Sequence, residues 1–518
     1  MSIAGAPIAA ADVVASKSAT RRQIRGSSLL LVGRLLSKGV NFGVQVLIVR
    51  YLSKGDFGAF AYALGIVAIV QTVVTFGLDR AVTRFVPIYH EQGDYPKMFG
   101  TLLMVVITMA ILGVSVIGGL YAAEAVMGTS MLDDARARSV VFILVLLGPL
   151  QALDGVMIGL FAVFASPRAI FFRKHVVAPL LKLAVVLALV FGGASVLFLA
   201  TGYVAAELLG IVIYTVLLVR VMKGSGLLAR FDRATVDIPW RTVLAFTVPL
   251  LTSDLVYVTM QSTNTIMLEH FGDTLQVASL RAVLPAAILN QLVFSSFATL
   301  FTPQAARMFA REDREGINDL YWQTAIWVAI LSFPVFALTF ALAGPFTTFV
   351  FGSEYADSGI ILSLLALGYY FNVALGFNGL TLKVYGKVGY IVKLNVAVVI
   401  VNLVLSVLLI PRYGALGAAI GTAATLIVHN ILKQAGLALG TGIRLFDRRY
   451  VPVYASIAVA TAGMLVMQVG WGPPMVVSFA AAALISLALL RFNRRLLDVE
   501  ETLPEIMRIP LAGRLLAK

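Results

Sequence analysis

Long apolar stretches follow one another along almost the whole chain, from Ser27 to Leu490, and polar clusters separate them. Most stretches are close to the roughly 20 residues that an α-helix needs to cross a bilayer. They lack the apolar and polar alternation of barrel strands, so the pattern excludes a transmembrane β-barrel. The apolar windows predict about fourteen membrane-spanning helices: 27–49, 57–79, 98–120, 139–161, 176–192, 197–219, 241–263, 277–301, 322–344, 359–379, 391–410, 414–438, 451–469 and 473–490.

Composition supports the same class. Of 518 residues, 60% are hydrophobic and 13% are charged, and the mean hydropathy is +0.93. Soluble proteins are roughly 45–50% apolar and about 25% charged, which excludes a soluble globule. The predicted fold class is therefore an all-α polytopic membrane protein. The chain has no cysteine and four histidines, so disulfides and thiolate chemistry are excluded, no cofactor is expected and any metal stays undetermined.

The basic residues fix an orientation. A net charge of +14 would indicate nucleic acid binding in a soluble protein, but here the loops explain it and no nucleic acid is expected. With the N-terminus in the cytoplasm, most basic residues fall on the cytoplasmic side, among them Arg80, Arg84 and Arg173. Both termini are therefore predicted to be cytoplasmic. The exceptions are Arg50, Lys54, Arg136, Arg138 and Arg412 outside, and Arg34, Lys38, Lys182 and Arg281 within the membrane.

The first predicted helix carries a polar stripe. Arg34, Lys38, Asn41 and Gln45 are three or four residues apart, which places them on one helix face. A charge at bilayer depth costs at least about 2.5–3.5 kcal/mol, so such residues are candidates for a functional site. Cationic donors suit an anionic ligand such as a diphosphate. We interpret the stripe as the substrate-binding wall of a hydrated cavity, and hydrogen bonding between helices is the alternative.

The seventh predicted helix carries a second stripe. Asp254, Tyr257, Gln261 and Asn264 again share one helix face. Asp254 is the candidate site for Na⁺ or H⁺, whose gradient would drive transport, or a partner for the basic face of an empty cavity. Arg281, in the eighth helix, is a further candidate for the cationic cavity, with snorkelling to the outer interface as the alternative.

Three other charges lie inside predicted helices of the first half. Asp154, Lys182 and Glu207 are intramembrane charges of weaker functional interest. They are predicted either to form buried ion pairs within the first six helices or to belong to the cavity.

The two stripes also indicate an internal repeat. A shift of 216 residues superposes Gln45 on Gln261 and Pro87 on Pro303, and it corresponds to six helices. Two six-helix lobes with both stripes facing a shared cavity would follow from this repeat. The predicted organisation is then a cytoplasmic disordered tail (1–26), an N-lobe (27–220), a cytoplasmic linker (221–240), a C-lobe (241–440), two extra helices (441–490) and a basic tail forming an interfacial helix (491–518).

Loop lengths and motifs narrow the function to transport. The predicted outer loops are short, which disfavours a glycan polymerase or ligase working on the outer face. The small-residue run Gly414-Ala-Leu-Gly-Ala-Ala-Ile-Gly421 lacks the lysine of a P-loop and instead suits close helix packing. Transport driven by an ion gradient remains, and a noncatalytic partner of a glycan synthesis complex is a further alternative.

Several motifs resemble those of a known family. They are Arg50-Tyr-Leu-Ser-Lys-Gly-Asp-Phe-Gly58, Phe76-Gly-Leu-Asp-Arg80, Arg84-Phe-Val-Pro87, Phe351-Gly-Ser-Glu-Tyr355 and Ile410-Pro-Arg-Tyr-Gly-Ala-Leu-Gly-Ala-Ala419. Over residues 25–440 the chain resembles the Wzx-type polysaccharide flippases of the multidrug/oligosaccharidyl-lipid/polysaccharide exporter superfamily. The resemblance implies two six-helix lobes in a V that open alternately to each side. Functional basic residues in helices 1 and 8 of related flippases suit Arg34, Lys38 and Arg281 by location.

The resemblance also implies a substrate. It points to export of lipid-linked, anionic glycans carried on undecaprenyl diphosphate across the plasma (inner) membrane for cell-surface or exopolysaccharide synthesis. Membrane lipids, a glycan polymerase and export machinery are the corresponding partners. A flippase for a lipid-linked peptidoglycan precursor is similar and stays open, as does a cation-coupled drug antiporter of the same fold, although the basic stripe disfavours the antiporter.

Overall fold

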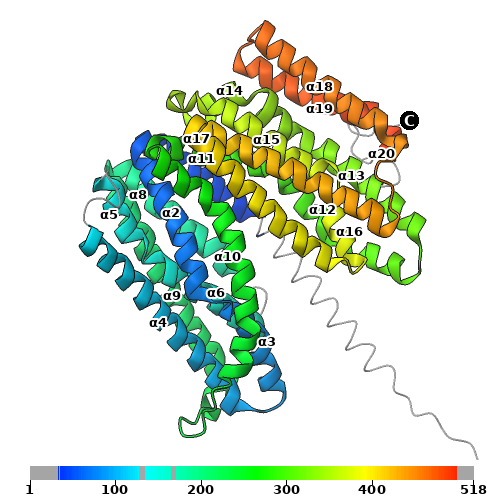
Figure 1. The fold of residues 1–518 in the computed structure, drawn as a ribbon. Helices are drawn as coiled ribbons and strands as arrows, with labels where there is room; N and C mark the ends of the chain where they lie inside the picture. Colours follow the sequence, from blue (N-terminus) through cyan, green and yellow to red (C-terminus); the bar gives the residue numbers. More distant parts are fainter. Residues whose placement is uncertain (1–32, 34, 128–134, 165–170, 499–518) are drawn as a thin grey trace, which may run out of the picture. The chain divides into compact units, whose positions relative to one another are not determined.

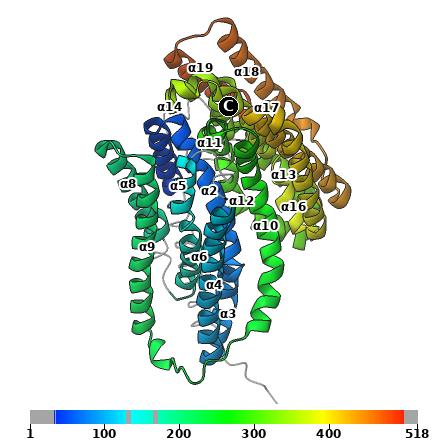
Figure 2. The ribbon, with the colours of Figure 1, turned by 60° about the vertical axis from the view of Figure 1, so that its left-hand side comes forward.

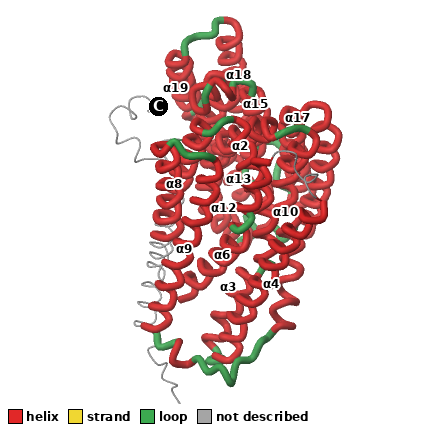
Figure 3. The backbone as a smooth tube through the Cα atoms, turned by 90° about the vertical axis from the view of Figure 1, so that its left-hand side faces the viewer, coloured by secondary structure: helices red, strands yellow, loops and turns green. Residues whose placement is uncertain are grey.

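The computed structural model describes residue 33 and residues 35–127, 135–164 and 171–498 (Figure 1). Helices joined by short loops make up this part of the chain, and no strand occurs in it (Figure 3). The predicted tail 1–26, Arg34 and most of the predicted interfacial helix 491–518 lie outside the described residues. The chain divides into two compact units, Met1–Ser262 and Thr263–Lys518. The division falls inside a helix, C-terminal to the predicted linker.

The first unit is a bundle in which α2 packs against α5 and α6, and α6 packs against α3 and α9 (Figure 2). Its described helices are residues 35–51, α2 (Lys54–Thr75), α3 (Leu78–Glu91), α4 (Tyr95–Met127), α5 (Ala135–Leu144), α6 (Leu147–Phe164), the π-helix η2 (Phe172–Val177), α8 (Ala178–Gly192), α9 (Val196–Gly224), the short η3 (Leu228–Arg230) and the first part of α10 (Trp240–Phe271).

The second unit is built around α15, which packs against α11, α13 and α17. Its helices after the end of α10 are α11 (Thr274–Ile288), η4 (Leu289–Gln291), α12 (Leu292–Ala310), α13 (Arg314–Phe336), the π-helix η5 (Ala337–Ala341), α14 (Ala343–Phe351), η6 (Ser353–Tyr355), α15 (Ser358–Ala374), α16 (Asn378–Val384), α17 (Val388–Thr441), η7 (Arg448–Tyr450), α18 (Val451–Gly470), α19 (Met475–Phe492) and α20 (Arg494–Leu497). The pair α18 and α19 adjoins α13 (Figure 1).

The helices are compatible with the predicted fourteen crossings. Within the described residues, 11 helical segments are long and apolar enough to cross a membrane. Residues 35–51 and α10 match two further predicted spans, 27–49 and 241–263. The segment Val388–Thr441 covers two more predicted spans, 391–410 and 414–438. The multi-pass, all-α class is thereby confirmed.

The long α17 is in fact a helical hairpin. Gly414 has φ 54° and ψ −132°, a combination that no helix contains. The side chain of Asn402 donates to Thr425 Oγ1 over 3.3 Å, and that of Tyr390 donates to the carbonyl of Leu432 over 2.7 Å. In both pairs, a residue before Gly414 contacts one at a similar distance after it along the chain. The two halves of α17 therefore run antiparallel. A glycine at the reversal avoids the clash that a Cβ meets in such a conformation.

Three other spans are interrupted rather than continuous. Phe76 and Gly77, both with positive φ, separate α2 from α3. Leu375–Phe377 separates α15 from α16, with Gly376 at φ +78°. The segment Leu289–Gln291 between α11 and α12 is a 3₁₀ turn. The span that we predicted to end at residue 79 continues through α3 to Glu91. Helix α3 is amphipathic: it buries Leu78, Val82 and Val86 on one face and exposes its charged side chains on the other.

Candidate functional site

The polar stripe of the first helix lies on its exposed face. Lys38 and Asn41 are exposed and Gln45 is half-buried. The opposite face is buried, and there the hydroxyl of Ser37 lies 2.9 Å from Nδ1 of His175, which η2 contributes. This hydrogen bond fixes the rotation of the helix and so keeps Lys38 on the open side. Arg34 lies outside the described residues.

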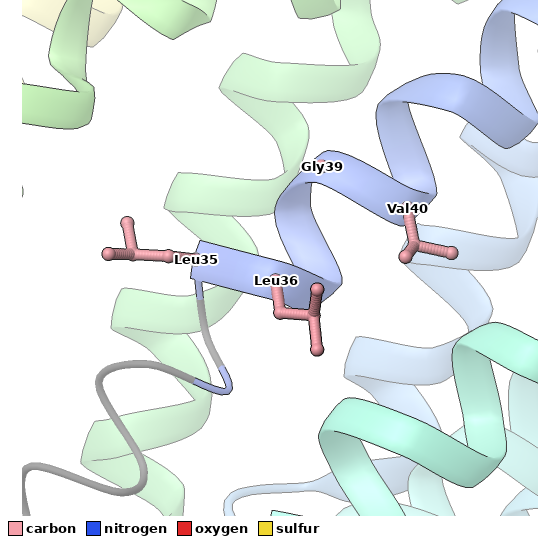
Figure 4. A pocket seen from close by; sticks show the side chains of 4 residues that line it. All are labelled: Leu35, Leu36, Gly39 and Val40. Atoms are coloured by element: carbon pink, nitrogen blue, oxygen red, sulfur yellow. The ribbon is translucent and has the colours of Figure 1, made fainter.

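An open hollow adjoins the same helix. It is lined by Leu35, Leu36, Gly39 and Val40, whose apolar side chains are seen in Figure 4. The lining is apolar, so this hollow by itself has no group that would bind an anion. The described cations of this helix are Lys38 and Arg50, and Lys38 is the one that lies beside the hollow.

Asp254 is paired within the first unit. Nη2 of Arg80, in α3, donates to Oδ1 of Asp254, in α10, over 2.7 Å. The side chains remain 46% and 30% exposed, so the surrounding helices do not enclose the pair. We predicted Arg80 in a loop on the cytoplasmic side, and the loop is wrong: α3 continues past Arg80 and directs it at α10. The side chains of Tyr257 and Gln261 lie outside the described part of the chain.

Arg84 extends the cationic face of α3 by one turn. Its guanidinium lies 4.6 Å from the ring centre of Phe246, in α10, and 5.5 Å from that of Phe85. These cation–π contacts hold Arg84 while leaving it exposed. Like Arg80, it was predicted in a loop and is helical instead. The signal in the sequence was the spacing of Arg80 and Arg84 opposite buried Leu78 and Val82.

A buried ion pair occupies the middle of the first unit. Arg173, in η2, forms an ion pair with Asp154, in α6, and its guanidinium also lies over the ring of Tyr214. Glu207 interacts electrostatically with both partners. Arg173 is helical and 5% exposed, so its predicted place in a loop is wrong. The helix begins at η2, before the start of the predicted span 176–192, and it places Arg173 in the interior of the first unit.

Lys182 is the fourth charge of this region. Its Nζ lies 5.7 Å from the ring centre of Tyr203, and it interacts electrostatically with Asp154. Lys174 interacts with Asp154 as well, so two acids lie among three bases in this cluster. The predicted alternative paired Lys182 with Asp154 or Glu207, whereas the ion pair that the structure shows joins Asp154 to Arg173.

Asn264 and Arg281 lie in the second unit and make internal contacts. Asn264 donates to Thr422 Oγ1 over 2.9 Å and accepts from Ser406 over 2.8 Å, which ties α10 to both halves of α17. Nε of Arg281 donates to Thr265 Oγ1 over 2.7 Å. Arg281 is half-buried and directed at α10, so α10 receives polar contacts in both units. In the residues that the structure describes, no group of three or more acidic or histidine side chains could hold a metal ion.

A family model described as a polysaccharide biosynthesis protein matches residues 24–309. This match covers more than half of the 518 residues. The chain belongs to the polysaccharide biosynthesis protein family. The matched segment of this family member contains Lys38, Arg80, Arg84 and Asp254.

Individual relatives share less than 30% sequence identity with the chain. Over 181 residues, 35% of the chain and 46% of the relative, the chain is 23% identical to the capsular polysaccharide biosynthesis protein CapF of Staphylococcus aureus. It is 24% identical over 35% of its length to the probable low-salt glycan biosynthesis flippase of Haloferax volcanii, of which it covers 36%. It is 28% identical to the succinoglycan biosynthesis transport protein ExoT of Rhizobium meliloti over 64% of each chain. The chain thus covers less than two thirds of each of these three relatives.

Solved structures show the same fold. The lipid II flippase MurJ in an inward closed conformation matches with a TM-score of 0.69, 13% identity, 90% coverage of this chain and 98% coverage of MurJ. An inward-facing multidrug resistance MATE family transporter of the MOP superfamily matches with a TM-score of 0.59, 13% identity, and 80% and 98% coverage. The predicted superfamily is confirmed by the family match together with these folds.

Proposed function

We propose that the protein is a flippase that moves a polyprenyl-diphosphate-linked oligosaccharide from the cytoplasmic to the outer leaflet of the inner membrane by alternating access. The observation that carries the proposal is the charge of the exposed polar residues in the first unit. Lys38, Arg80 and Arg84 are cations, and the carboxylate of Asp254 pairs with Arg80 alone among these three. The remaining positive charge suits a diphosphate.

The chemistry of the substrate fits these groups in a specific way. Guanidinium groups donate in pairs to phosphate oxygens, and a lysine supplies a compact charge. The sugars would occupy the hydrated space beside the polar stripes, and the polyprenyl tail would stay in lipid. An apolar groove between α18 and α19, lined by Pro452, Val459, Ile485 and Phe492 among others, supports a path for that tail.

Leaflet exchange in proteoliposomes tests the proposal. A fluorescent polyprenyl-diphosphate oligosaccharide is followed with the wild type, with Lys38→Ala and Arg34→Ala, which test the predicted stripe, and with Arg84→Ala. We expect transport by the wild type and a loss of at least about tenfold in the variants, because each removes a charge-assisted contact. Lys223→Ala, a change on an exposed lysine at the end of α9, is the matched control and should transport normally. Equal transport in all proteins would contradict the cationic site.

Energy coupling through Asp254 is the second part of the proposal. Binding of Na⁺ or H⁺ to the carboxylate would weaken its bond to Arg80 and release that arginine for substrate, which supports a gradient-driven cycle. Asp254→Asn should therefore lose the dependence of transport on the ion gradient. Normal transport with unchanged ion dependence would refute this role.

Two related substrates are distinguished by the same assay. A lipid-linked peptidoglycan precursor has the same diphosphate chemistry, so only exchange of the glycan separates the two flippase functions. A cation-coupled drug antiporter would need an accessible carboxylate, and the Arg80 bond to Asp254 disfavours it. A glycan polymerase and export machinery are the proposed partners, and both termini are proposed to be cytoplasmic.

A further inference from the structure

The second unit contains a long segment without acidic residues. Residues 358–446 include Lys383, Lys387, Lys393 and Lys433 but no aspartate or glutamate. Lys433 is half-buried, although it lies two turns inside the end of α17 at Thr441. Its charged neighbour is Lys383, and the imidazole of His429 also lies close to it. Like charges held together at a membrane-spanning helix need an anion to balance them.

Glycines shape the place where these lysines lie. A Cβ at position 379 of α16 would lie 3.6 Å from Cε and 3.7 Å from Nζ of Lys433. A Cβ at position 440 would lie 3.8 Å from Cε of Lys387. The lysine stems therefore rest on glycine backbone, which brings the ammonium groups closer to the helices than larger residues would allow.

Tyr390, at the start of α17, packs on the second half of that hairpin near these lysines. Its ring covers Gly436, where a Cβ would overlap it, and its hydroxyl donates to the carbonyl of Leu432 over 2.7 Å. Exposed apolar side chains flank the lysines, including Val388, Val392, Ile431 and Leu439. Lysines with apolar neighbours match a molecule that has both a phosphate and acyl chains.

We propose that Lys383, Lys387 and Lys433 bind the phosphate of an anionic phospholipid, whose acyl chains lie along the exposed apolar residues of α17. The site lies at the ends of α16 and α17, where a headgroup meets the hydrocarbon core. It is independent of the proposed flippase activity, since it involves none of the residues assigned to transported substrate. A bound lipid there would stabilise the α16 and α17 contact.

The test measures lipid binding to the purified full chain in neutral detergent, by native mass spectrometry. Short-chain phosphatidylglycerol is titrated against phosphatidylcholine for the wild type and for Lys383→Gln/Lys433→Gln. We expect about a tenfold loss of phosphatidylglycerol affinity in the variant, because each basic residue near a membrane surface contributes substantially. Phosphatidylcholine binding should not change. Lys383→Arg/Lys433→Arg keeps the charge and should retain affinity, while Lys54→Gln/Lys223→Gln removes the same charge elsewhere and should also retain it.

Three results would overturn the proposal. One is equal phosphatidylglycerol affinity in the wild type and the glutamine variant. Another is full displacement of the lipid by millimolar inorganic phosphate, which would assign the site to free phosphate. The last is a loss of undecaprenyl diphosphate binding in the glutamine variant without any loss of phosphatidylglycerol, which would assign the lysines to the transported substrate. None of these results depends on whether the protein transports glycans.

Discussion

The two units each contain an interrupted span, and the interruptions are stabilised differently. Between α15 and α16, the carbonyl of Ala374 accepts from the Tyr454 hydroxyl over 2.7 Å, and that of Leu375 accepts from the Tyr321 hydroxyl. Between α2 and α3, the described bonds come from the two helices themselves, such as Phe76 N–H to the carbonyl of Thr72. The break between α2 and α3 is therefore stabilised locally, and the break between α15 and α16 is stabilised by neighbouring helices.

A buried polar network surrounds the break in the second unit. Tyr321 also donates to Oε1 of Gln434 over 2.6 Å, and Gln434 donates to the carbonyl of Leu445 over 3.0 Å. Asn378 donates to Asn430 over 3.2 Å. These neutral groups lie where unpaired backbone would be costly, so they stabilise a non-helical segment at membrane depth. The comparison indicates a rigid second unit and a first unit whose break can change conformation at lower cost.

The largest predicted effect is that of Gly376→Ala. Gly376 has φ +78°, and a Cβ there would lie 2.8 Å from Cβ of Ala325 in α13. Backbone strain and overpacking together should lower the free energy of unfolding by about 3–4 kcal/mol. Thermal unfolding in detergent measures this loss.

Gly93→Ala is the matched control that separates backbone strain from the steric clash with α13. Gly93 has φ +71°, but nothing lies within 4 Å of the Cβ position. It therefore carries only the backbone cost, about 1 kcal/mol. Equal losses in both variants would show that the contact of Gly376 with α13 contributes nothing, and that the second break is no more constrained than an open turn.

Tyr321→Phe should have the next largest effect. The change removes one hydroxyl that serves the carbonyl of Leu375 and the side chain of Gln434. Leaving buried acceptors unpaired should cost about 2 kcal/mol. Tyr214→Phe makes the same change on a ring that is 2% exposed and whose hydroxyl has no hydrogen-bond partner in the described part of the chain. It should change stability by less than about 0.5 kcal/mol, and an equal loss in both would contradict the network.

The sequence predicted the helices better than the breaks. Apolar windows located α4 and α9 because a run of about 20 apolar residues is a direct physical requirement of a bilayer. The run through Leu375 and Phe377 is equally apolar, and its local mark is Gly376, which does not by itself predict an interruption. Its cause is the donors on α13 and α18, which only the fold brings near.

The positions of the charged site residues were harder to predict from the sequence than the breaks. Counting charges placed Arg80 and Arg173 in loops, because a basic residue at the end of an apolar window reads as the cytoplasmic side. Both are helical, and each is held by a carboxylate distant in sequence, Asp254 and Asp154. The polar face of the first helix could be predicted from spacing alone, and Lys38 and Asn41 are indeed exposed. Whether this face binds substrate remains a prediction.

The segment between α17 and α18 contains an ion pair, Asp447 with Arg449, whose strength should depend on pH. The hydrogen bonds from Arg449 hold the pKa of Asp447 below its ordinary value, and burial opposes them more weakly. Arg449 also bonds to Asp319, in α13, over 2.5 Å. Asp447 is 2% exposed, so Asp447→Asn should cost about 1–2 kcal/mol at neutral pH.

The sign of the pH dependence follows from the lowered pKa. The contribution of Asp447 should be complete above the unfolded value of about 3.9 and should disappear as the pH falls through the lower folded value. Thermal unfolding of the wild type and Asp447→Asn at several pH values measures it, and their difference should vanish in acid. A difference that persists below pH 3 would show that the asparagine acts through packing. Asp94→Asn is the matched control in the first unit, because Lys97 lowers the pKa of Asp94 in a similar way but at a more exposed pair.

The smallest predicted effect on stability is that of Arg80→Gln. The bond from Arg80 to Asp254 is partly exposed, so its loss should cost no more than about 1 kcal/mol. Asn264, on the same helix α10, makes two less exposed hydrogen bonds in the second unit, and Asn264→Ala should cost more, about 1–3 kcal/mol. Thermal unfolding of the two variants compares the two ends of α10 directly. If Arg80→Gln proved the more destabilising, the ion pair would be a structural tie as firm as the network of the second unit. A small loss of stability together with a large loss of transport would instead assign Arg80 to the transport cycle, since an arginine that only held α3 against α10 would affect both in proportion.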